Sequence, residues 1–160
     1  PDALLISEVW TNSNLKNEPK AFADISGAAF DFQTSFHILG EVKYGKTFDE
    51  IHVEEYNSQH NFVNFLGNHD TTRLKSILDE DENKVRIALK VLFEKTTGDI
   101  SLYYGDELGY SGHVINGNDR DVRKSIDYVD MAKAIKNKDS LFHYIKNLIS
   151  EDKKRRCGNK

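Results

Sequence analysis

Residues 64–74 read NFLGNHDTTRL, and within this stretch an apolar run gives way to polar groups. The run begins at Phe62 and stops at Gly67, and His69, Asp70 and Arg73 follow almost at once. A short apolar run without polar alternation is typical of a strand buried on both faces, as in a parallel sheet. Polar side chains of complementary chemistry at the end of such a strand indicate a functional surface.

Three further apolar runs lie at residues 3–6, 28–32 and 100–104. Segments with helical spacing separate them. One apolar stripe spans 85–93 behind acidic residues at 79–82, and another spans 141–149 with Asp139 or Ser140 as N-cap. Residues 33–43 and 48–56 are weaker helix candidates. Alternating strands and helices predict an α/β fold with a parallel sheet, layered or closed into a barrel.

In such folds function collects at the carboxyl ends of the strands. Each predicted strand carries or leads to a carboxylate there, namely Glu8, Asp31, Asp70 and Asp106. We therefore expect these four groups to converge on one site.

The composition bounds the function classes. A length of 160 residues suits one domain. The net charge of −4 does not indicate the basic surface that binds nucleic acid, so no nucleic-acid partner is expected. No apolar run is long enough to span a bilayer, so no membrane partner is expected. Cys157 is the only cysteine, which excludes an internal disulfide and a cysteine-based zinc site and leans toward a cytoplasmic location, the compartment being otherwise undetermined.

Two carboxyl groups facing a sugar can hydrolyse a glycosidic bond, one as acid and the other as nucleophile or base. Glu8 is our candidate acid, with Trp10 shielding the site so that Glu8 keeps its proton. His69 would bind sugar hydroxyls, and Asp70 would bind them more strongly as the ring becomes cationic. Taken singly, Glu8 could cap a helix, His69 could be structural, and Arg123 is better explained as an ion-pair partner.

A rival hypothesis makes His69 and Asp70 metal ligands of a phosphohydrolase. That site needs further converging histidines, and those at 37, 52, 60, 113 and 143 show no paired ligand spacing with His69. No metal site is therefore predicted.

Three segments, in chain order, resemble motifs of the α-amylase family of glycoside hydrolases: residues 8–10, 65–73 and 102–109. Residues 117–124 are similar to a loop of the neopullulanase, cyclomaltodextrinase and maltogenic amylase relatives. The predicted helix at 140–154 is similar to the helix that closes the family's barrel. The resemblance covers nearly the whole chain.

The resemblance implies that residues 1–160 are the C-terminal half, strands five to eight with their helices, of a (β/α)8 TIM barrel. The N-terminal half and the C-terminal β-sandwich domain would be absent. Glu8 would be the general acid/base and Asp70 a further catalytic carboxylate, with His69, Asn68, Trp10 and Arg73 binding the sugar. The implied chemistry is retaining cleavage or transfer at α-1,4, and also α-1,6, glucosidic bonds of α-glucans or maltooligosaccharides.

The chain departs from the family pattern at the nucleophile, which in the family is an aspartate on the fourth strand. No segment here supplies it, and Asp31 stands at the wrong strand, so we expect these residues alone to be inactive. The second hypothesis is a non-catalytic carbohydrate-binding or assembly module that keeps half of the sugar site. Calcium occurs among relatives, but no loop here can be assigned to it, so no cofactor is predicted.

Half a barrel would leave the strands at 3–6 and 100–104 with unpaired edges, which invite association. We therefore expect self-association or pairing with a complementary half-barrel.

Overall fold

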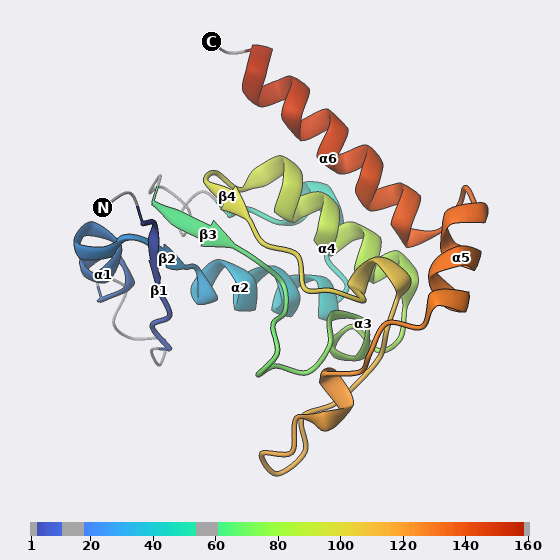
Figure 1. The fold of residues 1–160 in the computed structure, drawn as a ribbon. Coiled ribbons are helices and arrows are strands. Elements are labelled where there is room, and N and C mark those ends of the chain that lie inside the picture. The colour runs from blue at the N-terminus through green and yellow to red at the C-terminus, as the bar shows by residue number, and fades with distance from the viewer. Residues whose placement is uncertain (1–2, 11–17, 54–60, 159–160) are drawn as a thin grey trace.

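The computed structural model describes residues 3–10, 18–53 and 61–158, and within them the chain forms a four-stranded sheet (Figure 1). The strands are β1 (Leu5–Ser7), β2 (Gly27–Phe30), β3 (Phe62–Asn64) and β4 (Asp99–Ile100). Neighbouring strands pair in parallel in the order β1-β2-β3-β4. The four predicted strands and their parallel pairing are confirmed, although each strand is shorter than its apolar run.

The helices are α1 (Glu18–Ser26), α2 (Phe32–Lys43), α3 (Leu74–Ile77), α4 (Glu82–Lys95), α5 (Tyr128–Lys136) and α6 (Leu141–Gly158). The helices expected at 33–43, 85–93 and 140–154 are confirmed as α2, α4 and α6. Helices α1, α3 and α5 were not predicted.

The helix expected at 48–56 is wrong. Only Phe48–Glu50 form a 3-10 turn, closed by a capping box in which Thr47 and Glu50 bond reciprocally. Ile51 and Val53 then run on outside any helix and are buried in the core, and residues 54–60 lie outside the described part of the chain.

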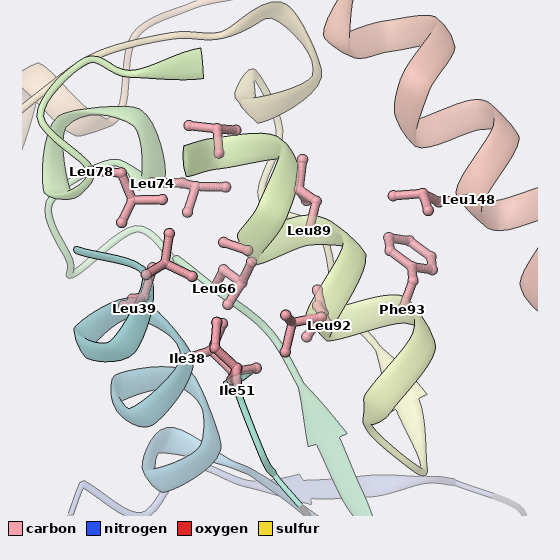
Figure 2. Close-up of a cluster of buried hydrophobic side chains, with 14 of the residues drawn as sticks. Ile38, Leu39, Ile51, Leu66, Leu74, Leu78, Leu89, Leu92, Phe93 and Leu148 are labelled. Atoms are coloured by element: carbon pink, nitrogen blue, oxygen red, sulfur yellow. The ribbon is translucent and has the colours of Figure 1, made fainter. Parts of the chain in front are cut away.

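The main core lies around α4, which packs between α2 and α6 (Figure 2). Asp81 starts α4 because its carboxylate accepts hydrogen bonds from the backbone N–H groups of Asn83 and Lys84. The helix then buries one apolar stripe with the spacing of a helical face. The members of this core that Figure 2 labels are Ile38, Leu39, Ile51, Leu66, Leu74, Leu78, Leu89, Leu92, Phe93 and Leu148.

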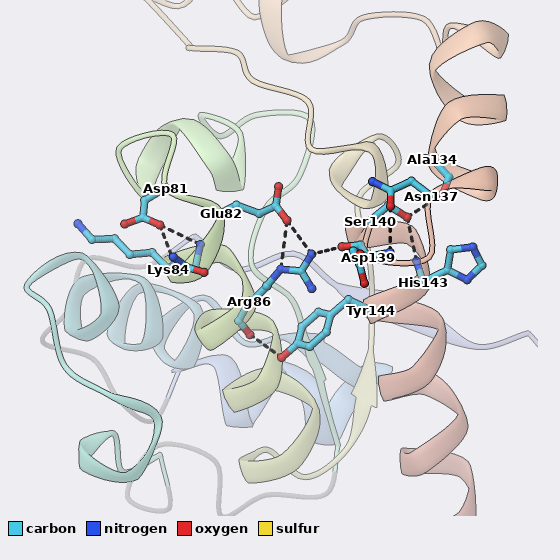
Figure 3. Close-up of polar contacts among 11 residues, drawn as sticks. Asp81, Glu82, Lys84, Arg86, Ala134, Asn137, Asp139, Ser140, His143 and Tyr144 are labelled. Atoms are coloured by element: carbon cyan, nitrogen blue, oxygen red, sulfur yellow. Dashed lines mark hydrogen bonds and ion pairs between the residues drawn. The ribbon is translucent and has the colours of Figure 1, made fainter.

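Polar contacts join the first turns of α6 to α4 (Figure 3). Arg86 of α4 binds Glu82 at 2.6 Å and donates to the carbonyl of Asp139, while the Tyr144 hydroxyl donates to the Arg86 carbonyl at 3.1 Å. The Ser140 hydroxyl accepts from the His143 N–H, which agrees with the predicted N-cap. The two contacts of Arg86 with Asp139 and Tyr144 hold the start of α6 against α4.

Apolar side chains are accessible at the β1 edge of the sheet and in the segment that follows β4. At the β1 edge Leu4 and Leu5 are 70% and 62% exposed. Next to β4 a groove of about 380 Å³ opens between residues 102–104 and α6 and is lined by apolar side chains that include Phe142 and Ile149. No helix within the described residues is long and apolar enough to cross a membrane.

Candidate functional site

Two predicted site segments leave the sheet at the same end. β1 leads into Glu8 and Trp10, and β3 leads, three residues further on, into Asn68, His69 and Asp70. Because β1, β2 and β3 run parallel, both segments emerge at the carboxyl edge of the sheet, with one strand between them.

The segment after β3 forms a tight turn whose shape Asn68 sets. The Asn68 side-chain oxygen accepts a hydrogen bond from the Asp70 N–H at 3.0 Å, and the Asn68 N–H donates to the Thr71 hydroxyl at 3.0 Å. A side-chain amide that bonds its own backbone two residues on makes an Asx-turn. Asn68, predicted as a sugar ligand, therefore also holds the turn that presents His69 and Asp70.

Asp70 is exposed and lies between two basic groups. His69 Nε2 is 3.3 Å from one carboxylate oxygen, and Arg123 Nη2 donates to the other at 2.9 Å. Arg123 also binds Asp119 through its Nε at 2.6 Å. The interpretation of Arg123 as an ion-pair partner is confirmed. Exposed pairs of this kind contribute at most about 1 kcal/mol each, so a sugar hydroxyl could replace Arg123 at Asp70 at small cost.

Arg73, predicted to bind sugar, is buried. Its side chain is 0% exposed and lies over the rings of Tyr103 and Tyr104, at 4.4 and 5.0 Å from their centres. The guanidinium donates to the Tyr104 carbonyl and to Asp106 Oδ1, the latter at 3.4 Å. A direct contact with sugar is not open to Arg73 in this structure, because two aromatic rings and a carboxylate surround it.

Asp106 is the buried partner of Arg73 and stands at the start of a short 3-10 turn after Gly105. Burial, the largest cause, raises the pKa of Asp106 to about 7, while Arg73 acts against this rise and Glu107 adds to it. The sequence analysis places Asp106 among four converging carboxylates and does not predict its burial against Arg73. The Gly-Asp step directly after an apolar run is the local feature that could have indicated a special turn.

The expected convergence of four carboxylates is wrong for two of them. Asp31 is buried and caps α2, accepting from the N–H and hydroxyl of Thr34. Asp106 is buried against Arg73. Of the four carboxylates, Glu8 and Asp70 remain exposed at the carboxyl edge.

Trp10 packs on the opening turns of α2, with its ring 4.7 Å from that of Phe32 and 6.1 Å from that of Phe36. Its own exposed fraction is 53%, which leaves a large aromatic face open beside the site. Glu8 is exposed as well, so the shielding expected from Trp10 is not seen at Glu8 in the described part of the chain.

The metal hypothesis finds no support in the geometry. Among the residues that the structure describes, no three His, Cys, Asp or Glu side chains gather as they would around a metal ion. His37 and His143 each lie within hydrogen-bond distance of a backbone carbonyl away from His69, at His52 and Ile135.

The sequence was compared with models of protein families and with known proteins. The family model described as "Alpha amylase, catalytic domain" matches residues 2–159. A cyclomaltodextrinase of Geobacillus thermopakistaniensis is 32% identical over 163 residues, which covers 98% of this chain and 26% of that protein. The intracellular maltogenic amylase of Bacillus subtilis is 29% identical over 168 residues, covering 94% and 25%. The chain spans about a quarter of the length of these relatives.

Solved structures of similar fold were also found. An α-amylase from H. orenii superimposes with a TM-score of 0.68 at 21% identity, over 94% of this chain and 36% of that one. A cyclic α-maltosyl-(1→6)-maltose hydrolase from Arthrobacter globiformis gives 0.71 at 19% identity, over 91% and 32%. At these identities the likeness concerns the fold.

Proposed function

The chain belongs to the α-amylase family of glycoside hydrolases. On this premise we propose that it supplies the general acid and several sugar-binding residues of an enzyme that acts on α-glucans. The substrates would be maltooligosaccharides or related α-glucans, cleaved or transferred with retention at α-1,4 bonds and also at α-1,6 bonds. We further propose that residues 1–160 correspond to strands five to eight of the family's barrel.

The catalytic roles follow from the chemistry of retaining glycosidases. The Glu8 carboxyl group donates its proton to the glycosidic oxygen as the bond to the leaving sugar breaks. A second carboxylate, from outside these 160 residues, forms the bond to the sugar carbon. Glu8, now a carboxylate, takes a proton from the water that releases the sugar. Asp70 and His69 bind hydroxyls of the same sugar ring.

The observation that carries this proposal is the exposed Asp70, held between His69 and Arg123 at the sheet edge onto which β1 also delivers Glu8. Ionised carboxylates and imidazoles are strong partners for sugar hydroxyls. The open aromatic face of Trp10 next to Glu8 adds an apolar surface of the kind that covers a sugar ring.

The partner of this part would be a complementary half-barrel or a second copy of the chain. Apolar side chains are exposed at the β1 edge, and an apolar groove lies between α6 and residues 102–104, which follow β4. A parallel strand paired with the outer edge of β4 would meet its backbone groups and extend toward this apolar lining.

A second candidate is a carbohydrate-binding module without catalysis. It is favoured by one observation, namely that the ion pairs at Asp70 are already formed while Glu8 is exposed just after the edge strand β1. In this case the sugar would bind to His69 and Asp70 and no bond would break.

The test has two measurements on the purified chain: reducing-sugar release from maltooligosaccharides and cyclodextrin, and calorimetric binding of maltoheptaose. We expect binding, a loss of at least tenfold in affinity in His69→Ala, and no turnover. Turnover that is lost in Glu8→Gln would contradict the external nucleophile. No binding by a folded chain would contradict the sugar site itself.

A half-barrel from a relative, supplying strands one to four, separates the two candidates. Turnover that appears on mixing and is lost in Glu8→Gln supports the enzyme. Binding without turnover in a mixture that forms a complex favours the binding module.

A further inference from the structure

A closed ring of contacts surrounds the candidate sugar-binding turn. The Arg73 N–H donates to the Gly112 carbonyl at 2.9 Å, and the Val114 N–H donates to the Thr72 hydroxyl at 3.2 Å. The segment after β4 is thereby tied to the segment after β3. The same segment continues to Arg123, which returns to Asp70.

Arg73 lies at the centre of this ring. Its guanidinium stacks on Tyr103, and the Tyr103 hydroxyl donates to the Val122 carbonyl at 3.2 Å, one residue before Arg123. Its ion pair reaches Asp106, whose Oδ2 would be 3.9 Å from a Cβ atom added at Gly67, directly before the turn. Two chain segments meet at Asp70, the one that follows β3 and the one that ends at Arg123. The buried Arg73 side chain contacts a residue that packs against each of them, namely Asp106 and Tyr103.

The backbone around Arg73 is shaped to fit it. Gly105 has a φ of +87°, and a Cβ atom there would lie 3.1 Å from Arg73 Nη1. At Gly112 a Cβ atom would lie 3.3 Å from Arg73 Cγ and 2.3 Å from the Asp121 carbonyl oxygen. The backbone at Gly105 and Gly112 therefore approaches Arg73 so closely that an added Cβ atom would be tight against it, and at Gly112 the contact with the Asp121 carbonyl leaves room for glycine alone.

We propose that Arg73 is a positioning residue, which sets the geometry of Asn68–Asp70 and of Arg123 at Asp70 without touching the sugar. The role of this turn as the sugar site rests on the proposed function above. Arg73 acts through two sets of contacts. It holds Asp106, which packs next to Gly67 before the turn, and it holds the Tyr103 ring, whose hydroxyl bonds the carbonyl of Val122 before Arg123. Both sets therefore fix the surroundings of Asp70.

A purely structural role for Arg73 is the competing explanation, and variants can separate the two. Arg73→Met removes the guanidinium and leaves Asp106 buried without its cation. Adding Asp106→Leu removes that charge, and apolar replacement of a buried ion pair is often neutral or stabilising. Leu89→Ala, in the core on α4, is the matched control that lowers stability without touching the ring of contacts.

The first readout is the set of backbone amide resonances and hydrogen-exchange rates at Asn68, Asp70 and Arg123, beside urea unfolding. In the double variant we expect near wild-type unfolding, shifted amide resonances at these residues, and exchange at Asn68 and Asp70 faster by tenfold or more. Leu89→Ala should unfold at clearly lower urea with these signals in place. Wild-type signals in the double variant would overturn the proposal.

The second readout is maltoheptaose affinity. If the wild-type chain binds, we expect at least a tenfold loss in the double variant and less than twofold in Leu89→Ala under conditions where it is folded. Equal affinity in the double variant and wild type would again overturn the positioning role. If the wild-type chain does not bind, the proposed function fails by itself, and the amide signals still decide the role of Arg73.

Discussion

Arg73 and Asp106 are in buried contact across 33 residues of sequence, with 3.4 Å between Nη1 and Oδ1 and side chains 0% and 6% exposed, and they form an ion pair when Asp106 is ionised. Removing one partner of such a pair leaves an uncompensated buried charge, which is strongly destabilising. Two further guanidinium nitrogens, Nε and Nη2, are buried without a hydrogen-bond partner among the described residues. The contacts of Arg73 with the two tyrosine rings and with Asp106 therefore offset much of the free-energy cost of removing its guanidinium from water.

The pair predicts a pH dependence of stability. Asp106 keeps its proton up to about pH 7 in the folded chain, because burial raises its pKa from the ordinary value of 3.8. Between these values the folded state holds more protons than the unfolded state, so this group makes the free energy of unfolding fall as pH rises. We expect a fall on the order of 4 kcal/mol between pH 4 and pH 7 from Asp106.

Urea unfolding of the wild type and of Asp106→Asn at several pH values measures this effect. Exposed groups such as Glu80 and Asp121, whose pKa values are lowered by hydrogen bonds from Ser111 and from Lys124, contribute the opposite slope in both proteins. The difference between the two curves therefore isolates Asp106. Parallel curves would show that Asp106 does not titrate in this range.

Gly105→Ala should lower the free energy of unfolding by about 2–4 kcal/mol, since strain at a left-handed φ adds to a steric clash. The added Cβ atom would lie 2.8 Å from the Tyr110 ring. Gly45→Ala is the matched control, because Gly45 has a φ of +90° with no atom within 4 Å of the added Cβ. Thermal or urea unfolding of both measures the clash, and equal losses would mean that Tyr110 moves aside freely.

Asp81→Ala should lower the free energy of unfolding by about 1 kcal/mol, because α4 loses the side chain that caps its first turn. Asp81→Asn keeps an oxygen acceptor at the same place, so its free energy of unfolding should fall by only a small fraction of the loss in Asp81→Ala. Chemical denaturation of the two variants and wild type gives the comparison. An equal loss in both would point to the charge of Asp81 in place of the cap.

Leu5→Lys should reduce self-association of the chain, because a charge at an exposed edge strand opposes pairing with another edge. Leu5 is 62% exposed on β1. Tyr44→Lys carries the same charge change at a residue 89% exposed after α2, away from both sheet edges, and should leave association unchanged. Sedimentation velocity measures both, and a wild-type chain that runs as a sharp monomer would count against association.

Much of the fold could be predicted because the relevant signals are local. Apolar runs at 28–32 and 62–66 were long enough to reveal buried strands, and the stripe on α4 repeats with the helical period. The helix prediction at 48–56 was wrong because the spacing of a single apolar turn resembles that of a helix. In the structure Ile51 and Val53 are buried in a non-helical segment. Helix α5 was not predicted although its apolar residues recur with the helical period, and none of its residues is buried.

The site divided in the same way. By itself the sequence determined that Glu8, His69 and Asp70 follow parallel strands, because strand direction alone brings such residues to one edge. Only the tertiary structure decided that Asp31 caps a helix and that Arg73 is buried on two tyrosine rings. These outcomes depend on which partners the folded chain brings within a few ångströms. A charged side chain is buried or exposed according to those partners, and residues 33 positions apart leave no local pattern of their pairing.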